Sequence, residues 1–270
     1  MERFVKANAS YPVIAGVLPT LFESEIDACD ENKIRIRVLS NSDNKQGKLL
    51  AEKLSSCNPD EPCQSFACAE CVRRFRVKKI NQLVNFCEDY KSWNVVTLIY
   101  YDEMAPSLSR LNIPRLKDRL RKQLNRAGVE DVIIGCFEAD YHPEYEYWMP
   151  HFHLLVKNAV CNSIEWINFR KNHAKHQKID GIEMQTKRPV LFQWLKNPAE
   201  QIAYIYKVMW QQVDAFYYGD RRYTKKYRLG RNRFVSSLLK LDSFKLSDIE
   251  FMYRLRQYGT TLKYPVRGKK

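Results

Sequence analysis

The sequence predicts an α+β fold, in which helices pack on one face of an antiparallel sheet. Apolar runs rich in β-branched and aromatic residues alternate along the chain with amphipathic patterns of helical period. The segment that separates two of these runs, residues 141–150, is short enough for antiparallel pairing. Hydrophobic residues make up 45% of the 270 positions, which is ample for a packed core and argues against wholesale disorder.

The charge balance limits the classes of partner. Lysine and arginine number 45 against 31 acidic residues, which gives a formal net charge of +14. This excess predicts a polyanionic partner, with nucleic acid first and an anionic membrane surface second. No run of about 18 apolar residues is present, so no membrane-spanning segment is expected. The apolar patch near the N-terminus is interrupted by Pro12 and Pro19 and makes a poor signal peptide, so we expect a cytoplasmic protein.

Two segments precede the main alternation of strands and helices. Residues 1–45 form an N-terminal extension whose one regular pattern is a strand-like "KIRIRVL" at 33–39. Residues 46–91 contain a cysteine-rich stretch and a connecting helix, expected at 69–93 because its apolar residues recur with helical spacing. We therefore expect a small module ahead of the main domain.

Four of the eight cysteines of this chain gather within fifteen residues. They follow a C-x5-C-x4-C-x2-C pattern and are Cys57, Cys63, Cys68 and Cys71. Zinc in structural sites takes four soft ligands in a tetrahedron, and a short loop with two close cysteines commonly supplies half of them. The cluster predicts a small module with structural Zn²⁺, and buried thiols or a redox pair of Cys68 and Cys71 are the alternatives.

Residues 92–212 carry the alternation on which the fold prediction rests. Strands are expected at 94–104, 130–140, 150–158 and 190–194, the last as one strand or as a bent pair with 181–188. Helices are expected at 112–128, 163–176 and 197–212. His173 and His176, in the second of these helices, are expected at the surface.

Residues 213–270 form a basic C-terminal region. Within it, "RRYTKKYRLGRNRF" has no acidic residue and seven basic ones, which are Arg221, Arg222, Lys225, Lys226, Arg228, Arg231 and Arg233. Tyr223 and Tyr227 lie among these charges, and basic groups interleaved with stacking rings commonly hold single-stranded nucleic acid. This stretch is predicted to bind DNA, although a solvated basic surface is an equally good interpretation of the segment alone.

A His-x-His pair marks the strand at 150–158. Side chains alternate along a strand, so His151 and His153 point to the same face. Two imidazoles on one face are either ordinary polar residues of a solvated face or part of a metal site, and the pair alone does not decide between them. A metal that binds phosphate oxygens prefers an oxygen as its third ligand. Glu138 in the preceding strand is the expected ligand. The alternatives that remain open are Asp140, Glu144 and Glu146.

The last predicted helix of this domain combines a carboxylate, a phenol and an ammonium group. Glu200, Tyr204 and Lys207 stand at i, i+4 and i+7, so they share a face of a continuous helix. A lysine near the tyrosine hydroxyl could stabilise its phenolate or a phosphate under attack. The structural alternatives are a core tyrosine, a capping box between Glu200 and Asn197, and a solvated Lys207.

These motifs, taken together, resemble the HUH endonucleases of the rolling-circle replication initiator type with a single catalytic tyrosine. The resemblance covers residues 92–212 and rests on four features: "VVTLIYYD" at 95–102, Glu138, "WMPHFH" at 148–153 and "YIYK" at 204–207. It implies an RRM-like nuclease core that binds Mg²⁺ or Mn²⁺ through Glu138, His151 and His153. It also implies that Tyr204, assisted by Lys207, attacks single-stranded DNA to form a 5′-phosphotyrosine, and that Glu200 acts as a base.

The sequence also departs from the minimal nuclease of that family. The cysteine module resembles the zinc-binding modules that precede some HUH transposases, so the DNA is either a replication origin or a transposon-end hairpin. The resemblance leaves a helicase or other replication partner open. Tyr206, Tyr217 and Tyr218 are rival nucleophiles, and a non-catalytic zinc-containing nucleic-acid-binding protein is the alternative from another functional class.

Overall fold

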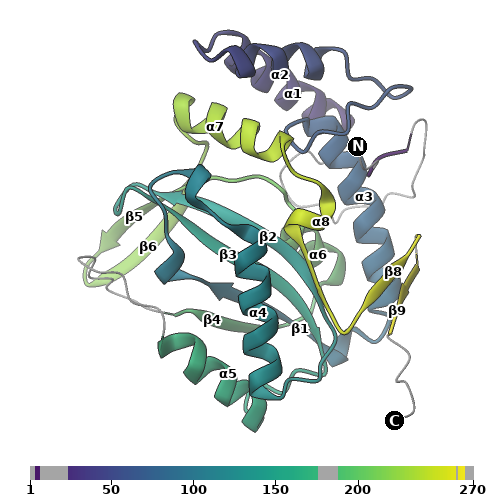
Figure 1. Ribbon diagram of the computed structural model, residues 1–270, viewed down its shortest axis with the longest axis vertical. Coiled ribbons are helices and arrows are strands. Elements are labelled where there is room, and N and C mark those ends of the chain that lie inside the picture. Colours follow the sequence, from purple (N-terminus) through teal and green to yellow (C-terminus); the bar gives the residue numbers. More distant parts are fainter. Residues whose placement is uncertain (1–3, 7–23, 176–187, 260, 265–270) are drawn as a thin grey trace.

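The computed structural model describes residues 4–6, 24–175, 188–259 and 261–264. Two helices, α1 (Glu25–Ser40) and α2 (Lys45–Ser55), precede the cysteine-rich loop, and α3 (Ala69–Phe86) follows it. Figure 1 shows α1 and α2 stacked on the C-terminal helix α7 (Arg231–Asp242), while α3 runs beside the sheet. The helix expected at 69–93 is therefore present in a shorter form.

The strand expected at 33–39 is wrong, because this stretch lies inside α1. Ser24 begins the helix with a capping box, in which its hydroxyl accepts from the Asp27 amide and the Asp27 carboxylate accepts from the Ser24 amide. The buried positions of α1 recur with helical spacing, but some of them are polar or charged, so a hydrophobic pattern does not show the helix. They are Ala28, Glu31, Asn32, Arg35 and Leu39.

Seven strands of the described segments form one sheet in the order β4-β1-β3-β2-β5-β6, with β7 paired to β2. Their bounds are β1 Trp93–Ile99, β2 Ile133–His142, β3 Tyr147–Lys157, β4 Val190–Trp194, β5 Gln212–Tyr218, β6 Arg221–Tyr227 and β7 Glu250–Tyr253. The sheet is mixed rather than purely antiparallel, because β5 runs parallel to β2 at the pair Tyr141 and Gln212. The connection that leads into β5 contains a helix, which allows β5 to run parallel to β2. A hairpin would allow only antiparallel pairing.

Helices contact both faces of this sheet, not one face as expected. Helix α4 (Ile113–Ala127) crosses the front of β1, β2 and β3 in Figure 1 and begins at Asn112, as predicted. It ends at Gly128, which adopts the left-handed φ of 76° that favours glycine. On the opposite face, helix α6 (Pro198–Ile205) places the Tyr204 ring against His153. The sheet face that carries the histidines is therefore only partly covered.

Helix α5 (Ile164–Lys175) corrects the surface assignment of His173. Its imidazole is fully buried, stacks on Phe169 and hydrogen-bonds through Nε2 to the Ile99 carbonyl at 2.9 Å. His176 and residues 181–187 lie outside the described residues.

The predicted helix at 197–212 and the basic region after it also differ from expectation. Helix α6 ends at Ile205, and residues 212–227 form the β5–β6 hairpin, closed by Gly219 at φ 57°. Helix α7 is followed by α8 (Leu246–Ile249), β7 and a second small sheet of β8 (Arg256–Tyr258) and β9 (Thr261–Lys263). Within the described residues, no helix has the length and hydropathy needed to cross a bilayer.

Candidate metal centre and tyrosine groove

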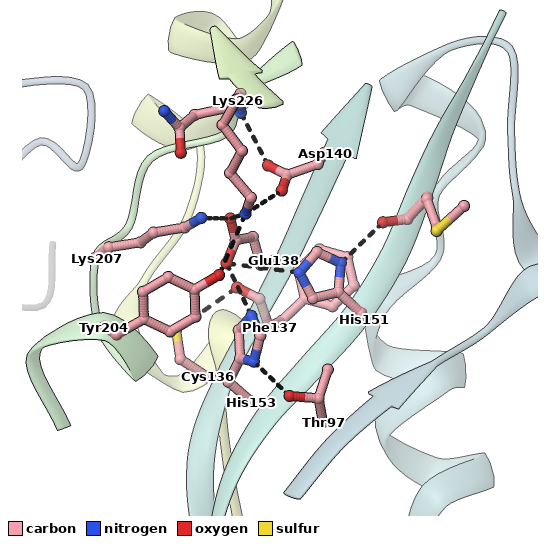
Figure 2. A network of polar contacts seen from close by, with 12 residues as sticks. Thr97, Cys136, Phe137, Glu138, Asp140, His151, His153, Tyr204, Lys207 and Lys226 are labelled. Atoms are coloured by element: carbon pink, nitrogen blue, oxygen red, sulfur yellow. Dashed lines mark hydrogen bonds and ion pairs between the residues drawn. The ribbon is translucent and has the colours of Figure 1, made fainter. Parts of the chain in front are cut away.

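Two neighbouring strands bring the two histidines and a carboxylate to one point. In the antiparallel register of β2 and β3, Glu138 lies opposite His151 and Cys136 lies opposite His153, so all four side chains share a face. The Oε2 atom of Glu138 is 3.5 Å from His151 Nε2 and 3.3 Å from His153 Nε2. Figure 2 shows both rings turned toward this carboxylate. The three groups are buried and could bind a metal ion.

The placement of the ring nitrogens around Glu138 fits a cation. His151 Nδ1 lies 3.0 Å from the Met149 carbonyl, which can only accept, so Nδ1 carries the proton. Burial lowers the pKa of His153 to about 4, so this ring is neutral at pH 7. The Nε2 atoms of both rings face Glu138, and His153 Nε2 is buried with no hydrogen-bond partner. A cation bound between these nitrogens and the carboxylate would give each of the three groups a partner.

Two lysines from different parts of the chain keep the Glu138 carboxylate ionised. Its burial opposes ionisation, but the Lys207 and Lys226 ammonium groups keep the pKa of this carboxyl well below its usual range. Lys207 forms a buried ion pair with Glu138 Oε1, and Lys226 lies 4.0 Å from the same atom. The carboxylate is therefore ionised at neutral pH and available as a ligand.

The sequence did not indicate the place of Lys226 beside this cluster, since we expected it in a DNA-binding tail. The β5–β6 hairpin brings its Nζ to 2.7 Å from Asp140 Oδ2 and to 3.3 Å from the Tyr204 hydroxyl, to which it donates. Two acidic neighbours, Glu138 and Asp140, outweigh its burial and raise its pKa. The Gly219-Asp220 pair between two strand-like runs was the available signal for this hairpin.

Tyr204 lies at the edge of the metal cluster. Its ring centroid is 5.0 Å from that of His153, and the side chain remains 42% exposed toward the groove. The Lys207 ammonium lies 5.0 Å from the ring centroid and the Lys226 ammonium 5.6 Å. The phenol is therefore accessible to a substrate and is surrounded by positive charge.

The three other candidate tyrosines lie in different surroundings. Tyr206 is fully buried and donates to Glu250 Oε1 at 2.9 Å, and burial together with Glu250 raises the pKa of its phenol well above the usual range. Tyr217 and Tyr218 lie on β5 and do not line the groove beside the cluster, and Tyr217 contacts Glu144. Tyr204 is thus the candidate that the structure brings to the histidines.

The expected helical face of Glu200, Tyr204 and Lys207 is only partly present. Glu200 and Tyr204 both line the groove from α6, one turn apart. Lys207 lies beyond the helix end, in a turn where Val208 adopts a φ of 46°, and it reaches Glu138 from there. The three residues therefore converge through a turn and not through a continuous helix.

The capping-box alternative for Glu200 is wrong. The backbone amides of Lys196 and Asn197 donate to Gln201 Oε1, at 2.7 and 3.0 Å, so Gln201 caps the helix entry. Glu200 instead accepts from the Asn197 side-chain amide at 3.2 Å. Glu200 therefore does not complete a capping box with Asn197.

The alternative third ligands occupy separate positions. Asp140 shares the face of Glu138, but its two oxygens accept from the Gln211 amide and from Lys226. Glu144 is paired with Arg222 at 2.6 Å, and Glu146 lies in the β2–β3 turn with a φ of 60°. Glu138 is the carboxylate that faces both histidines.

A groove of about 1530 Å³ opens above the cluster. One wall comes from β4 and the start of α6, with Trp194 64% exposed, and the other comes from the β5–β6 hairpin, with Tyr223 42% exposed. Figure 2 shows Tyr204 and Lys226 on the same side of the cluster.

The seven basic residues of the tail do not form one continuous surface. Arg221, Arg222 and Lys226 line the groove, and Lys225 is exposed on the hairpin. The other three hold the chain to the rest of the fold. Arg228 pairs with Glu31 of α1, Arg231 donates to the Asn41 carbonyl, and Arg233 lies over the Tyr141 ring.

The four clustered cysteines converge at the start of α3. Cys68 is the N-cap of that helix and Cys71 lies in its first turn. The Sγ of Cys57 is 3.6 Å from those of Cys68 and Cys71, and Cys63 Sγ is 3.7 Å from Cys71 Sγ. Four sulfurs at 2.3 Å from a tetrahedral zinc would be roughly 3.8 Å apart. The cluster could therefore hold a structural zinc.

Comparison with known proteins gives no assignment. No protein-family model, curated protein or solved structure matches this chain.

Proposed function

We propose that this protein is a metal-dependent endonuclease that nicks and rejoins single-stranded DNA through Tyr204. The observation that carries the proposal is the packing of the Tyr204 ring on His153, which places an accessible phenol beside the Glu138–His151–His153 cluster. A phenol is a weak nucleophile at neutral pH, so this chemistry needs positive charge near its oxygen. The hydrogen bond from Lys226 to that oxygen meets this requirement.

In the proposed reaction, the Tyr204 oxygen attacks a phosphodiester of the bound strand. A bond forms between this oxygen and phosphorus, the bond from phosphorus to the 3′-oxygen breaks, and the proton lost by the phenol is balanced by the one that the 3′-oxygen gains. The products are a 5′-phosphotyrosine and a free 3′-hydroxyl. The reverse reaction rejoins strands without ATP, because the energy of the phosphodiester is retained in the phosphotyrosine.

The residues around Tyr204 have separate roles in this proposal. Lys226, held by Asp140, stabilises negative charge on the attacking oxygen, and Lys207 balances the charge of Glu138. Glu200 lines the groove one helical turn before Tyr204, where its carboxylate can orient a water that releases the adduct.

Glu138, His151 and His153 would hold a Mg²⁺ or Mn²⁺ ion, which supplies Lewis-acid polarisation of the scissile phosphate when bound. Two imidazole nitrogens and one carboxylate favour Mn²⁺, because Mg²⁺ prefers oxygen ligands.

The groove suits a single strand of nucleic acid. Trp194 and Tyr223 expose aromatic surface on opposite walls, on which unpaired bases can stack. Lys196, Arg221 and Arg222 line the same groove and can neutralise phosphates. The net charge of +14 would draw the strand toward the protein.

Initiation of rolling-circle replication of a plasmid or phage is the role that we propose for this activity. It is supported by the single tyrosine, Tyr204, that contacts the histidine cluster within the described residues. A transposase would apply the same chemistry to a transposon-end hairpin. Cleavage of origin-derived and transposon-derived oligonucleotides, compared side by side, would separate the two roles.

The first experiment is a search for the covalent intermediate. Labelled single-stranded DNA incubated with the protein and Mn²⁺ should give a protein–DNA adduct that survives denaturation in SDS, and EDTA should suppress it. The same sequence as a duplex should give little adduct, because its bases are unavailable for stacking. Tight DNA binding without an adduct under any divalent metal would instead identify a non-catalytic nucleic-acid-binding protein.

Zinc in the cysteine cluster should be required for stability. Replacing Cys71 with serine is expected to lower the zinc content from about one per chain and to reduce the melting temperature, because zinc binding contributes directly to folding. Elemental analysis and calorimetry measure the two effects. The matched control is Cys161→Ser, a partly exposed thiol outside the cluster, which should retain its zinc. A wild-type protein purified without zinc, with a melting temperature insensitive to chelators, would contradict this assignment.

A further inference from the structure

Helix α6, which carries Tyr204, has only eight residues and depends on its neighbours for its position. Its last turn does not continue, because the Lys207 amide bonds to the Tyr204 carbonyl at 3.3 Å and not to that of Ala203. The buried Arg76 of α3 donates to the Ala203 carbonyl instead, at 3.3 Å. The last turn of α6, which carries Tyr204, is therefore hydrogen-bonded to α3.

A buried polar network also connects the residue that follows α6, Tyr206, to β7 and α3. The Glu250 carboxylate of β7 lies 2.5 Å from the Lys79 ammonium of α3 and accepts from the Tyr206 hydroxyl at 2.9 Å. Lys79 and Glu250 are 3% and 4% exposed and Tyr206 is fully buried, so water does not screen these contacts. The Phe75 ring of α3 packs edge-on against Tyr206, with 6.2 Å between centroids.

The same network reaches the strand that carries the candidate metal ligand. Glu250 pairs with Cys136 of β2, which stands two residues before Glu138 on the same face. Lys79, Glu250 and Tyr206 thus connect α3, the end of α6 and the metal strand in the interior of the protein. Because burial of an ion pair is costly, the Lys79–Glu250 pair is poor evidence for a role in stability alone.

From these contacts we infer that Lys79, Glu250 and Tyr206 are positioning residues, which hold Tyr204 in register with the Glu138–His151–His153 cluster. This inference rests on the proposed function for its catalytic consequence. Its structural content, the placement of Tyr204 by α3 and β7, can be measured without any reaction. Neither a DNA contact nor a metal ligand is assigned to the three residues.

The test uses the full chain with ring-¹³C-labelled tyrosine, in which the Tyr204 signal is identified by its loss in Tyr204→Phe. Tyr206→Phe deletes one hydroxyl and leaves the Lys79–Glu250 pair intact. It should shift or broaden the Tyr204 signal, which senses the His153 ring 5.0 Å away. The rate of adduct formation should fall about 10- to 100-fold, since small misplacements of reacting groups cost this much. Affinities for single-stranded DNA and Mn²⁺ should stay within about twofold of wild type.

A second variant distinguishes a loss of positioning from a loss of folding. Lys79→Met combined with Glu250→Gln removes both charges together and so leaves no unpaired buried ion. It should reproduce the Tyr204 shift and the slower adduct formation at an unchanged melting temperature. The matched control is Lys53→Met, which breaks the ion pair between α2 and α7 and should leave the Tyr204 signal unchanged.

Different results would refute the positioning role and the proposed nuclease function. A folded Tyr206→Phe protein with a wild-type Tyr204 signal and a wild-type adduct rate would overturn the positioning role. Absence of any adduct in the wild-type protein would refute the proposed function, while the displaced Tyr204 signal in the variants would still support positioning by α3 and β7.

Discussion

Replacing Tyr204 with phenylalanine is expected to abolish the covalent protein–DNA adduct. The substitution keeps the ring that packs on His153 and deletes the one atom that can bond to phosphorus. Loss of a nucleophile lowers turnover by a factor on the order of 10⁴ or more. Folding should change little, by less than about 1 kcal/mol, because the lost hydrogen bond from Lys226 joins two partly exposed groups. Adduct yield on a denaturing gel, together with a melting curve, measures both effects.

The rival tyrosines on β5 provide the matched controls for this substitution. Tyr217→Phe and Tyr218→Phe should both retain the adduct, because neither side chain lines the groove above the cluster. DNA affinity of Tyr204→Phe should remain close to that of the wild-type protein, since phosphate contacts come from basic residues elsewhere. An adduct that persists in Tyr204→Phe and disappears in one of the controls would transfer the nucleophile to that residue.

Replacing His153 with alanine should abolish metal-dependent cleavage. The change removes one of the three ligands while leaving the basic groove in place. A metal that stabilises charge in the transition state is worth several kcal/mol, so cleavage in Mn²⁺ should fall by at least about 10³-fold. Binding of Mn²⁺, followed by calorimetry or by its paramagnetic resonance signal, should weaken in parallel, and DNA binding should not.

The control for His153→Ala is a histidine that is equally buried and outside the cluster. His173→Gln removes an imidazole that stacks on Phe169 in α5, so it should cost stability and retain cleavage below its melting temperature. If His153→Ala cleaves DNA as fast as wild type at saturating Mn²⁺, the Glu138–His151–His153 cluster is not the catalytic metal site.

Several parts of the fold followed from local patterns. Strand β4 and helices α3, α4 and α5 lie within the ranges expected from residue spacing, and β1, β2 and β3 overlap theirs with ends shifted by one to five residues. The Asn112 and Gly128 signals marked α4 correctly, since capping depends on a few adjacent residues. Helix α1 was missed because three of its five buried residues are polar or charged. Two of them have partners far away in the chain: Glu31 contacts Arg228 and Asn32 contacts Glu70.

In the candidate site too, some features followed from the local sequence and others from the pairing of distant segments. Alternation along β3 placed His151 and His153 on one face, and the short turn after β2 predicted that an acidic residue of β2 lies opposite them. Alternation could not choose between Glu138 and Asp140, which stand two residues apart on the same face. The register decided, because Glu138 stands opposite His151, while Asp140 stands opposite Met149 and is engaged by Lys226.

The sequence by itself determined the strand pair that carries Glu138, His151 and His153 and the clustered cysteines, since each depends on spacing within a strand or loop. The structure then separated Tyr204 from its three rivals, because only its ring among them packs on His153. Only the tertiary structure decided that Lys226 contacts the Tyr204 hydroxyl and that Lys79 and Glu250 hold Tyr206. These contacts join residues 22, 171 and 44 positions apart. A charge in the sequence does not specify its distant partner, because that choice depends on which segments the packed core brings together and shields from water.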